Sequence, residues 1–210
     1  MIVDLHSRTS AYSECGRDSL TAMVRAAMDR GLDALCVTEH DVVYPEERAD
    51  AEVGGGPEGM TLFRGIEVNC HGPGGIVAHI VVLGCEELQG PYHDPGELER
   101  LVRRSGAAMV LAHPFRYGDD AHRIVECLTI DAIEVDSVNV DEVAAAKAAE
   151  FAESLGLPQV AGSDAHRVAD VGAYATRFDR PVGTASELAK ELRAGRVHPV
   201  RWSSLKGEWE

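Results

Sequence analysis

The sequence lacks several features that would place it in a common class of proteins. Its 210 residues contain no apolar run long enough to cross a bilayer, so we expect no membrane-spanning segment. The five cysteines form no C-x-x-C pair and their number is odd, which is typical of free thiols in a reducing compartment. The glycine-rich stretch at residues 54–56 has neither the Gly-x-Gly-x-x-Gly spacing nor a following Lys-Ser/Thr pair, so it predicts a flexible connection and no phosphate-binding loop.

Positive charge is also scarce. The chain has 20 Lys and Arg residues against 35 Asp and Glu residues, which gives a formal net charge of −15. A phosphate backbone would be repelled by this field, so we expect no stable nucleic-acid binding. Divalent cations could compensate part of the negative charge locally, and the acidic balance therefore favours metal binding weakly.

The composition that remains is typical of a soluble globular protein with a single core. Hydrophobic residues make up 45% of the chain and charged residues 26%, and the length suits one domain. We assign residues 1–202 to this domain and residues 203–210 to a C-terminal tail. Met1 opens directly into an apolar strand, which leaves no room for a signal or transit peptide and predicts a cytoplasmic protein. The sequence does not indicate an oligomeric state.

Short apolar strands that end in polar residues recur along the chain. The first begins at Ile2 and leads directly into His6 and Arg8. Further strands are predicted at residues 32–38, 62–68, 76–84, 107–112, 132–135, 159–162 and 197–200, with a short one near residue 174. Helices are predicted at residues 18–31, 96–105, 120–128, 140–155 and 184–194, and a short acidic helix begins near residue 44. The active site of a β/α barrel is assembled from the C-terminal ends of its strands, so this pattern predicts an α/β barrel.

The nine histidines divide into two groups by their neighbours. Four are flanked by Gly, Pro or other polar residues and are expected at the surface, namely His71, His93, His122 and His198. Five lie in or just after apolar strands, where an unpaired imidazole is costly to bury. These five are His6, His40, His79, His113 and His166. With Glu67 and Asp164 they would form a nitrogen and oxygen site for Zn, Mn or Fe, although two or three of them could instead be core residues bonded to backbone carbonyls.

Six short motifs occur in order along nearly the whole chain. They are DLHSRT from residue 4, GLDALCVTEHD from 31, GIEV from 65, HIVVLG from 79, AHPFR from 112 and GSDAH from 162. Together they resemble the successive motifs of the PHP (polymerase and histidinol phosphatase) superfamily. The resemblance implies an irregular seven-stranded β/α (TIM-like) barrel of the PHP type, in a single domain, with a phosphoesterase site of two or three metals.

The resemblance also implies a set of metal ligands. The first metal would be held by His6, Glu67 and Asp164. The second would be held by Glu67, His79 and His113, with Glu67 bridging the two cations. The third would be held by His40 and His166, completed by a side chain of the loop after the first strand. In that loop Glu14 is the candidate and Cys15 is the reserve.

The chain departs from the family pattern at Arg8, where the family has a second histidine. A guanidinium is permanently protonated and cannot ligate a cation. Two unit charges about 4 Å apart repel by roughly 4 kcal/mol at an effective dielectric near 20. We therefore expect fewer than three metals, with two favoured, and we expect Arg8 to bind the bridging carboxylate or a substrate phosphate. The alternative is that Arg8 turns outward and pairs with Glu14.

The predicted function is that of a metal-dependent phosphoesterase. Its substrate would be a small phosphorylated molecule such as a sugar phosphate, a nucleotide or a phosphoamino acid, and a metal would supply hydroxide at neutral pH. Arg8 and Arg116 would clamp the phosphate, unless Arg116 forms a surface ion pair with Asp119 or Asp120. Asp164 and His166 complete the predicted catalytic residues; His166, or His40, could act as acid or base if no metal binds it.

Two other functions stay open. An amidohydrolase-like deacetylase would use the same metals on a C–N bond, but the sequence shows neither a carboxylated lysine nor a His-x-His start. A degenerate PHP-like module, with its metal site decayed at Arg8, would bind a ligand or partner without catalysing a reaction.

Overall fold

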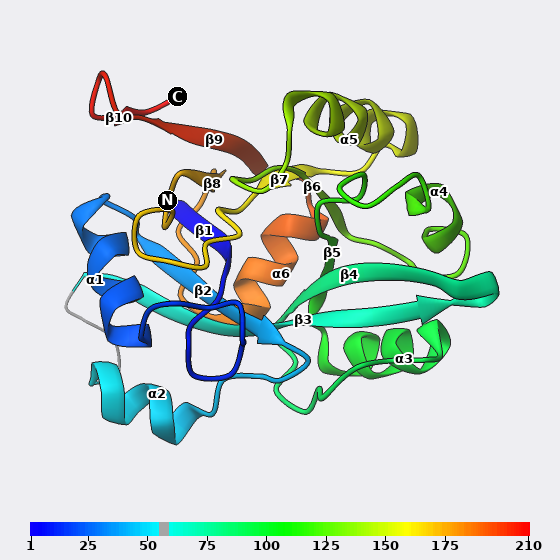
Figure 1. The fold of residues 1–210 in the computed structure, drawn as a ribbon, viewed down its shortest axis with the longest axis horizontal. Coiled ribbons are helices and arrows are strands. Elements are labelled where there is room, and N and C mark those ends of the chain that lie inside the picture. Colours follow the sequence, from blue (N-terminus) through cyan, green and yellow to red (C-terminus); the bar gives the residue numbers. More distant parts are fainter. Residues whose placement is uncertain (55–58) are drawn as a thin grey trace.

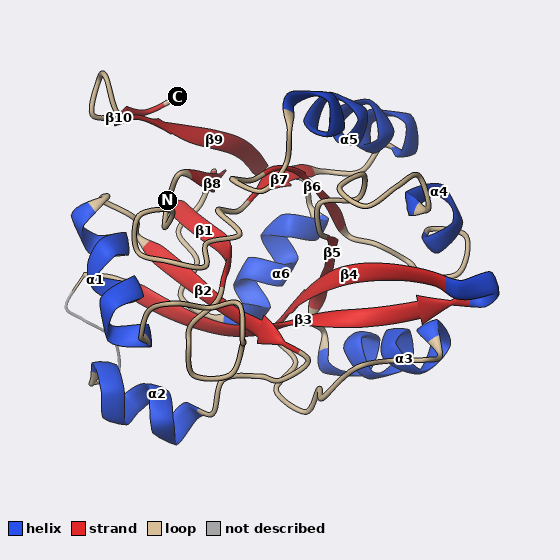
Figure 2. Cartoon of the chain, in the orientation of Figure 1, coloured by secondary structure: helices blue, strands red, loops and turns tan. Residues whose placement is uncertain are grey.

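The computed structural model describes residues 1–54 and 59–210, which form an α/β fold around one curled sheet (Figures 1 and 2). Its ten strands lie in the order β10-β9-β8-β1-β2-β3-β4-β5-β6-β7. They are β1 (Ile2–Ser7), β2 (Ala34–His40), β3 (Thr61–Gly72), β4 (Ile76–Leu83), β5 (Ala108–Leu111), β6 (Ala132–Asp136), β7 (Gln159–Ala161), β8 (Tyr174–Phe178), β9 (Val197–Ser203) and β10 (Glu208–Trp209).

Strand direction determines where the polar ends of the strands meet. Strands β1, β2 and β3 are parallel, as are β5, β6 and β7, whereas β4 is antiparallel to both β3 and β5. The chain after β7 returns to β1, where the Arg8 backbone N–H donates to the Ala165 carbonyl at 2.9 Å. The C-terminal ends of six strands therefore lie at one rim of the curled sheet.

Six α-helices connect the strands. They are α1 (Leu20–Asp29), α2 (Glu46–Val53), α3 (Pro95–Ser105), α4 (Ala121–Ile124), α5 (Glu142–Leu155) and α6 (Ala185–Arg193), and the 3₁₀ turn η1 (Pro73–Gly75) joins β3 to β4. Side chains cap α1, α3, α5 and α6, because each N-cap Ser, Asp or Thr accepts a hydrogen bond from a first-turn N–H. Figure 1 shows α6 in the middle of the curled sheet, with the other helices at the periphery.

The concave face of the sheet combines an apolar floor with a polar rim. Phe63, Val81 and the buried face of α6 belong to one apolar cluster on this side. Side chains alternate between the two faces of a strand, so residues an even number of positions apart share a face. Glu67 lies four residues after Phe63 in β3, and His79 lies two residues before Val81 in β4. Both side chains therefore share the concave face with the apolar floor, nearer the rim.

The α/β class in a single domain is confirmed, and so are most of the predicted elements. The sheet of the described residues has ten strands, and the seven-stranded barrel stays a prediction. The predicted helix at 120–128 is also shorter and ends at Ile124. Residues 203–210, expected as a tail, instead end β9 and form β10, where Trp209 packs edge-on against Trp202 at 5.3 Å between ring centroids.

Two sequence predictions concern features away from the rim. Within residues 1–54 and 59–210, no helix combines the length and the apolar character needed to cross a membrane. The glycine-rich connection was predicted at residues 54–56, and residues 55 and 56 lie outside the described part of the chain. Gly54 itself ends α2 in the left-handed conformation, with φ of 67°.

Candidate active site

The rim of the sheet gathers the predicted site residues around the Glu67 carboxylate. Glu67 is fully buried within β3, and its two oxygens face different groups. His79 reaches it from β4, and because this strand runs against its neighbours, the ligand-type residue lies in its first half. His113 follows β5, and Arg8 follows β1.

Two imidazoles meet at one oxygen of Glu67. His79 Nδ1 lies 3.0 Å and His113 Nε2 3.1 Å from Glu67 Oε1. Burial is the largest cause that lowers the pKa of His79, to about 4, and that of His113, to about 3. Both rings are therefore neutral near pH 7, which is the form that ligates metals.

Arg8 lies at the other oxygen of Glu67. Its side chain is 1% exposed, and its Nη2 donates to Glu67 Oε2 while its Nη1 donates to Asp164 Oδ1. The same two nitrogens lie 3.0 Å from His6 Nε2 and 3.0 Å from His166 Nε2. Arg8 thus contacts both carboxylates and two of the predicted ligand histidines, and the alternative in which it turns outward to Glu14 is wrong.

Asp164 is the second carboxylate that organises the rim. Its Oδ2 accepts hydrogen bonds at 2.9 Å from Arg116 Nη1 and at 2.9 Å from Asn139 Nδ2. Burial by itself would raise the pKa of Asp164, but the neighbouring His6 and Arg8 outweigh it and hold the pKa well below its usual range. Asp164 is therefore ionised, and the proposed surface ion pair of Arg116 with Asp119 or Asp120 does not form.

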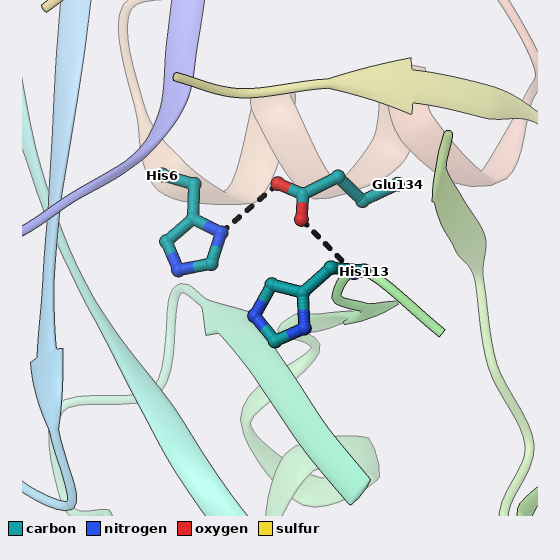
Figure 3. Close-up of side chains that lie close together, drawn as sticks. All are labelled: His6, His113 and Glu134. Atoms are coloured by element: carbon teal, nitrogen blue, oxygen red, sulfur yellow. Dashed lines mark hydrogen bonds and ion pairs between the residues drawn. The ribbon is translucent and has the colours of Figure 1, made fainter. Parts of the chain in front are cut away.

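Glu134 orients two histidines from behind (Figure 3). It lies in β6, and its Oε1 accepts from His6 Nδ1 at 2.9 Å while its Oε2 accepts from the His113 backbone N–H at 3.0 Å. A carboxylate behind an imidazole fixes which ring nitrogen carries the proton and leaves the other free to act as a ligand or acceptor. Here His6 Nε2 faces Arg8, and since arginine has only donors, this nitrogen must be the acceptor.

The backbone around the rim is tightly constrained. Asp164 and His113 have positive φ angles of 52° and 30°, a region that costs non-glycine residues on the order of 1–3 kcal/mol and recurs at functional sites. A Cβ atom added to Gly162 would lie 2.6 Å from the Cβ of His6, so only glycine fits there. Asp4 fastens the segment after β7 by accepting from the N–H groups of Ser163 at 2.8 Å and Gly172 at 2.9 Å.

Two groups of side chains have the geometry of a metal site. One consists of Glu67, His79 and His113 and the other of His6, His113 and Glu134, with the ligand atoms of each group within 4.8 Å of one another. Two neutral imidazoles and a carboxylate fit Zn, Mn or Fe, so the first group is suited to a transition metal. In the second group, N–H donors already occupy both oxygens of Glu134.

The predicted third metal site is not assembled in the same way. His40 Nδ1 is buried, lies 3.2 Å from Glu67 Oε2 and has no hydrogen-bond partner among the described residues. Burial, followed by the charge of Arg8, lowers the pKa of His40 to about 3. Glu14 is exposed and forms no hydrogen bond or ion pair with any described residue, and Cys15 is a free, half-buried thiol. The structure therefore brings His40 to the cluster, while Glu14 stays outside its network of contacts.

A small pocket opens beside the two imidazoles at Glu67 Oε1. It holds about 60 Å³, and its walls include His79, His113, Pro114 and Tyr117. At roughly 15 Å³ for each water site, this is room for about four waters. Tyr117 is 72% exposed at the mouth, and the guanidinium of Arg116 lies over its ring at 5.0 Å.

Sequence reasoning missed three residues of this arrangement. Glu134 ends a predicted strand, which was the available signal, but it received no role in the site. Asn139 lies in a loop with no motif around it, and Tyr117 directly follows the AHPFR motif. Only the fold brings the two residues to Asp164 and the pocket.

Comparisons with known proteins give one family match and several similar folds. A PHP-associated family model matches residues 143–197, the segment that carries Asp164 and His166. A comparison with curated protein sequences gives no match. The crystal structure of PsfC from Pseudomonas syringae is similar with a TM-score of 0.72 and 24% sequence identity, over 98% of this chain and 93% of that one.

Two further structures share the fold at lower identity. An amidohydrolase from Chromobacterium violaceum, solved with bound sulfate and no metal, has a TM-score of 0.68 and 19% identity, over 97% of this chain and 99% of that one. A protein from Bifidobacterium adolescentis, proposed to be a metal-dependent phosphoesterase, has a TM-score of 0.64 and 13% identity, over 93% of this chain and 96% of that one.

Proposed function

We propose that this chain, whose resemblance to the PHP superfamily is confirmed by the family match and the fold, is a metal-dependent phosphoesterase for a small phosphorylated molecule. The observation that carries the proposal is the meeting of His79 and His113 at Glu67 Oε1, beside a small pocket. Three protein ligands leave coordination positions free for water and substrate.

The chain's own residues suit the binding of a phosphate ester at this place. A bound Zn, Mn or Fe ion would supply Lewis acidity and a hydroxide at neutral pH. Arg116, 25% exposed and held by Asp164, offers N–H groups at the rim for the phosphoryl oxygens. His166, half-buried with its pKa lowered by burial and by Arg8, accepts from Arg8 Nη1 at 3.0 Å. His40 Nδ1 has no hydrogen-bond partner among the described residues and would be the neutral acceptor for a proton.

The similar structures support this choice of substrate. The Chromobacterium amidohydrolase binds sulfate, a tetrahedral dianion of the same shape as phosphate, and the Bifidobacterium protein is proposed to be a phosphoesterase. We include in the proposal the seven-stranded barrel, formed by β1–β7 with β8–β10 as an extension beyond β1. A cytoplasmic location and the absence of stable nucleic-acid binding also remain proposals, supported by five free cysteines and a net charge of −15.

A phosphate-release screen tests the proposed reaction. The panel would contain sugar phosphates, nucleotides, phosphoamino acids and short oligonucleotides, each with Mn, Zn, Fe or Mg added separately. We expect release from a phosphomonoester that chelation abolishes, and a loss of at least about a hundredfold in His113→Ala, because one metal ligand is removed. Activity that is indifferent to chelator and to this substitution would contradict the proposal.

The amidohydrolase reaction is the second candidate, and the name of the Chromobacterium relative favours it. The same cation would polarise an amide carbonyl and not a phosphoryl oxygen. A parallel screen with N-acyl substrates separates the two candidates, since release of an amine without release of phosphate would select this one. If metal-loaded protein shows neither activity, the degenerate binding module would be favoured.

A further inference from the structure

The position of Arg8 determines how many cations this site can hold. We propose that the Arg8 guanidinium takes the place of one metal ion, so that each chain binds a single divalent cation, between Glu67, His79 and His113. The inference rests on the metal site of the proposed function, and it departs from the two metals favoured by the sequence.

Arg8 occupies the donor atoms that a metal in its place would need. Its Nη2 faces Glu67 Oε2 and His6 Nε2, and its Nη1 faces Asp164 Oδ1 and His166 Nε2. A guanidinium only donates hydrogen bonds, so the lone pairs of both imidazole nitrogens point to its N–H groups. His6, Glu67 and Asp164 are the predicted ligands of the first metal, and each of them has Arg8 as a partner at the atom that would bind a cation.

Arg8 is not easily displaced from this position. Its side chain is 1% exposed, and its guanidinium lies between two buried carboxylates, those of Glu67 and Asp164. Its backbone N–H is also bonded to the Ala165 carbonyl, which holds the start of the side chain beside the segment after β7. Entry of a cation would require a buried charge to leave two carboxylates, which is strongly unfavourable.

The opposite oxygen of Glu67 has no such competitor. His79 and His113 are the groups closest to Glu67 Oε1, and His79, with 18% of its side chain exposed, borders the pocket. A cation here would have an imidazole on each side, a carboxylate oxygen and open positions toward the pocket. The two oxygens of Glu67 would then bridge a metal ion and a guanidinium, where a dinuclear site has two metals.

The charges around the rim agree with one cation. Glu67, Asp164 and Glu134 contribute three negative charges, while Arg8 and Arg116 contribute two positive ones. One divalent cation therefore gives the rim a small net positive charge, which suits an anionic substrate. A second divalent cation would lie beside Arg8, which already pairs with the two carboxylates that it would need, Glu67 and Asp164.

The test is a count of metal ions per chain, in the wild type and in two arginine variants. Each protein is stripped of metal, reconstituted with Zn or with Mn, freed of excess ion and measured by elemental analysis and native mass spectrometry. Arg8→His restores an imidazole where the superfamily has one. Arg100→His adds a histidine to the exposed side of α3 and controls for adventitious binding.

We expect one ion per chain in the wild type and in Arg100→His, and two in Arg8→His. Two or more ions in the wild type would overturn the inference while leaving the metal-dependent function intact. No ion in the wild type would overturn the proposed metal site itself, and with it the function. One ion in a folded Arg8→His protein, as judged by circular dichroism, would also overturn the inference. If Arg8→His does not fold, the wild-type count alone still decides between one ion and more.

Discussion

The two oxygens of one carboxylate, that of Glu67, have different surroundings. At Oε1 two neutral imidazoles approach from β4 and from the end of β5, next to a pocket. At Oε2 a buried guanidinium donates to Glu67 and continues to Asp164. One side of the carboxylate therefore has the ligands for an exchangeable cation, whereas the other side carries a cation that belongs to the chain.

A metal cluster usually combines a structural role and a reactive role, and here these two roles fall to different groups. Arg8 joins the end of β1 to β3 and to the segment after β7. We expect these contacts to persist whether or not a metal is bound. The Oε1 side is left for chemistry, because Lewis acidity and hydroxide formation need a metal and a guanidinium provides neither. The structural half of the rim should therefore be independent of metal, and the reactive half should depend on it.

The largest effect is expected from Glu67→Gln, which alters both halves at once. The variant should lose its metal, because Glu67 is one of the three proposed ligands and orients the other two. Its kcat/KM should fall at least about a thousandfold. It should also lose about 3 kcal/mol of unfolding free energy, since Arg8 is left beside a neutral amide. Elemental analysis, phosphate release and urea unfolding measure these three effects.

The matched control for Glu67→Gln is chelated wild-type protein. Chelation should remove activity to a similar extent but cost less stability, because the contacts of Arg8 stay in place. If chelation destabilises the protein as much as Glu67→Gln does, the two halves are not separable.

The next largest effect is expected in the stability of the metal-free protein as a function of pH. His40, His79 and His113 have pKa values lowered by burial to about 3, 4 and 3, against about 6.5 in an unfolded chain. Their contribution to stability is present above pH 6.5 and is lost as the pH falls, because only the unfolded chain takes up these protons. Each histidine contributes up to about 1.4 kcal/mol for each pH unit below that value.

Three carboxyls oppose this trend. Burial raises the pKa of Asp4 and that of Asp136 to about 6, and it also raises the pKa of Glu39, so their contribution is largest at low pH and is lost as the pH rises through about 6. The pKa values of the three histidines lie farther from their unfolded values than those of Asp4 and Asp136, so urea unfolding of the metal-free protein should show falling stability from pH 7 to pH 5. The decline should be shallower in His79→Gln, and an unchanged slope in that variant would remove the basis of the prediction.

Arg116→Gln should have a smaller effect that is confined to the substrate. Arg116 is partly exposed and is one of three side chains that donate hydrogen bonds to Asp164. Its loss should therefore change metal content and folding little. The KM for a phosphate ester should rise about tenfold, the size of one lost charge-assisted hydrogen bond, with a smaller change in kcat. A fall in metal content in this variant would show that Arg116 supports the structure of the metal site and does not act on the substrate alone.

Glu14→Gln should have the smallest effect. Glu14 was the sequence candidate for the third metal, but it is exposed and outside the contacts of the cluster. The number of bound ions and kcat/KM should both stay within about twofold of the wild type. A lost ion in this variant would restore Glu14 as a ligand and would show that the loop after β1 closes over the site.

The sequence predicted what depends on strand periodicity and on residue type. Apolar strands ending in His, Asp or Glu were enough to place His6, Glu67, His113 and Asp164 at one rim, because parallel strands share their C-terminal edge. The unusual residue Arg8 was also visible, since arginine cannot replace a ligand histidine. Its expected contact with the bridging carboxylate is present in the structure.

The remaining features depend on distances that periodicity does not contain. The helix α6 on the concave face and the extra strands β8–β10 follow from long-range packing, which no local pattern encodes. Glu134 could be read as another polar strand end, but its place behind His6 depends on the curl that brings β6 opposite β1. Glu14 faces the solvent because of the direction in which the loop after β1 turns. Neither composition nor spacing predicts that direction.

The most direct test of the central claim is a crystal structure of the wild-type protein grown with Mn or Zn, with anomalous data collected at the absorption edge of the metal. The account predicts one anomalous peak, within bonding distance of Glu67 Oε1, His79 Nδ1 and His113 Nε2, with Arg8 still bonded to Glu67 and Asp164. Two or three peaks around Glu67, or a peak at the position of the guanidinium with the Arg8 side chain displaced, would contradict it.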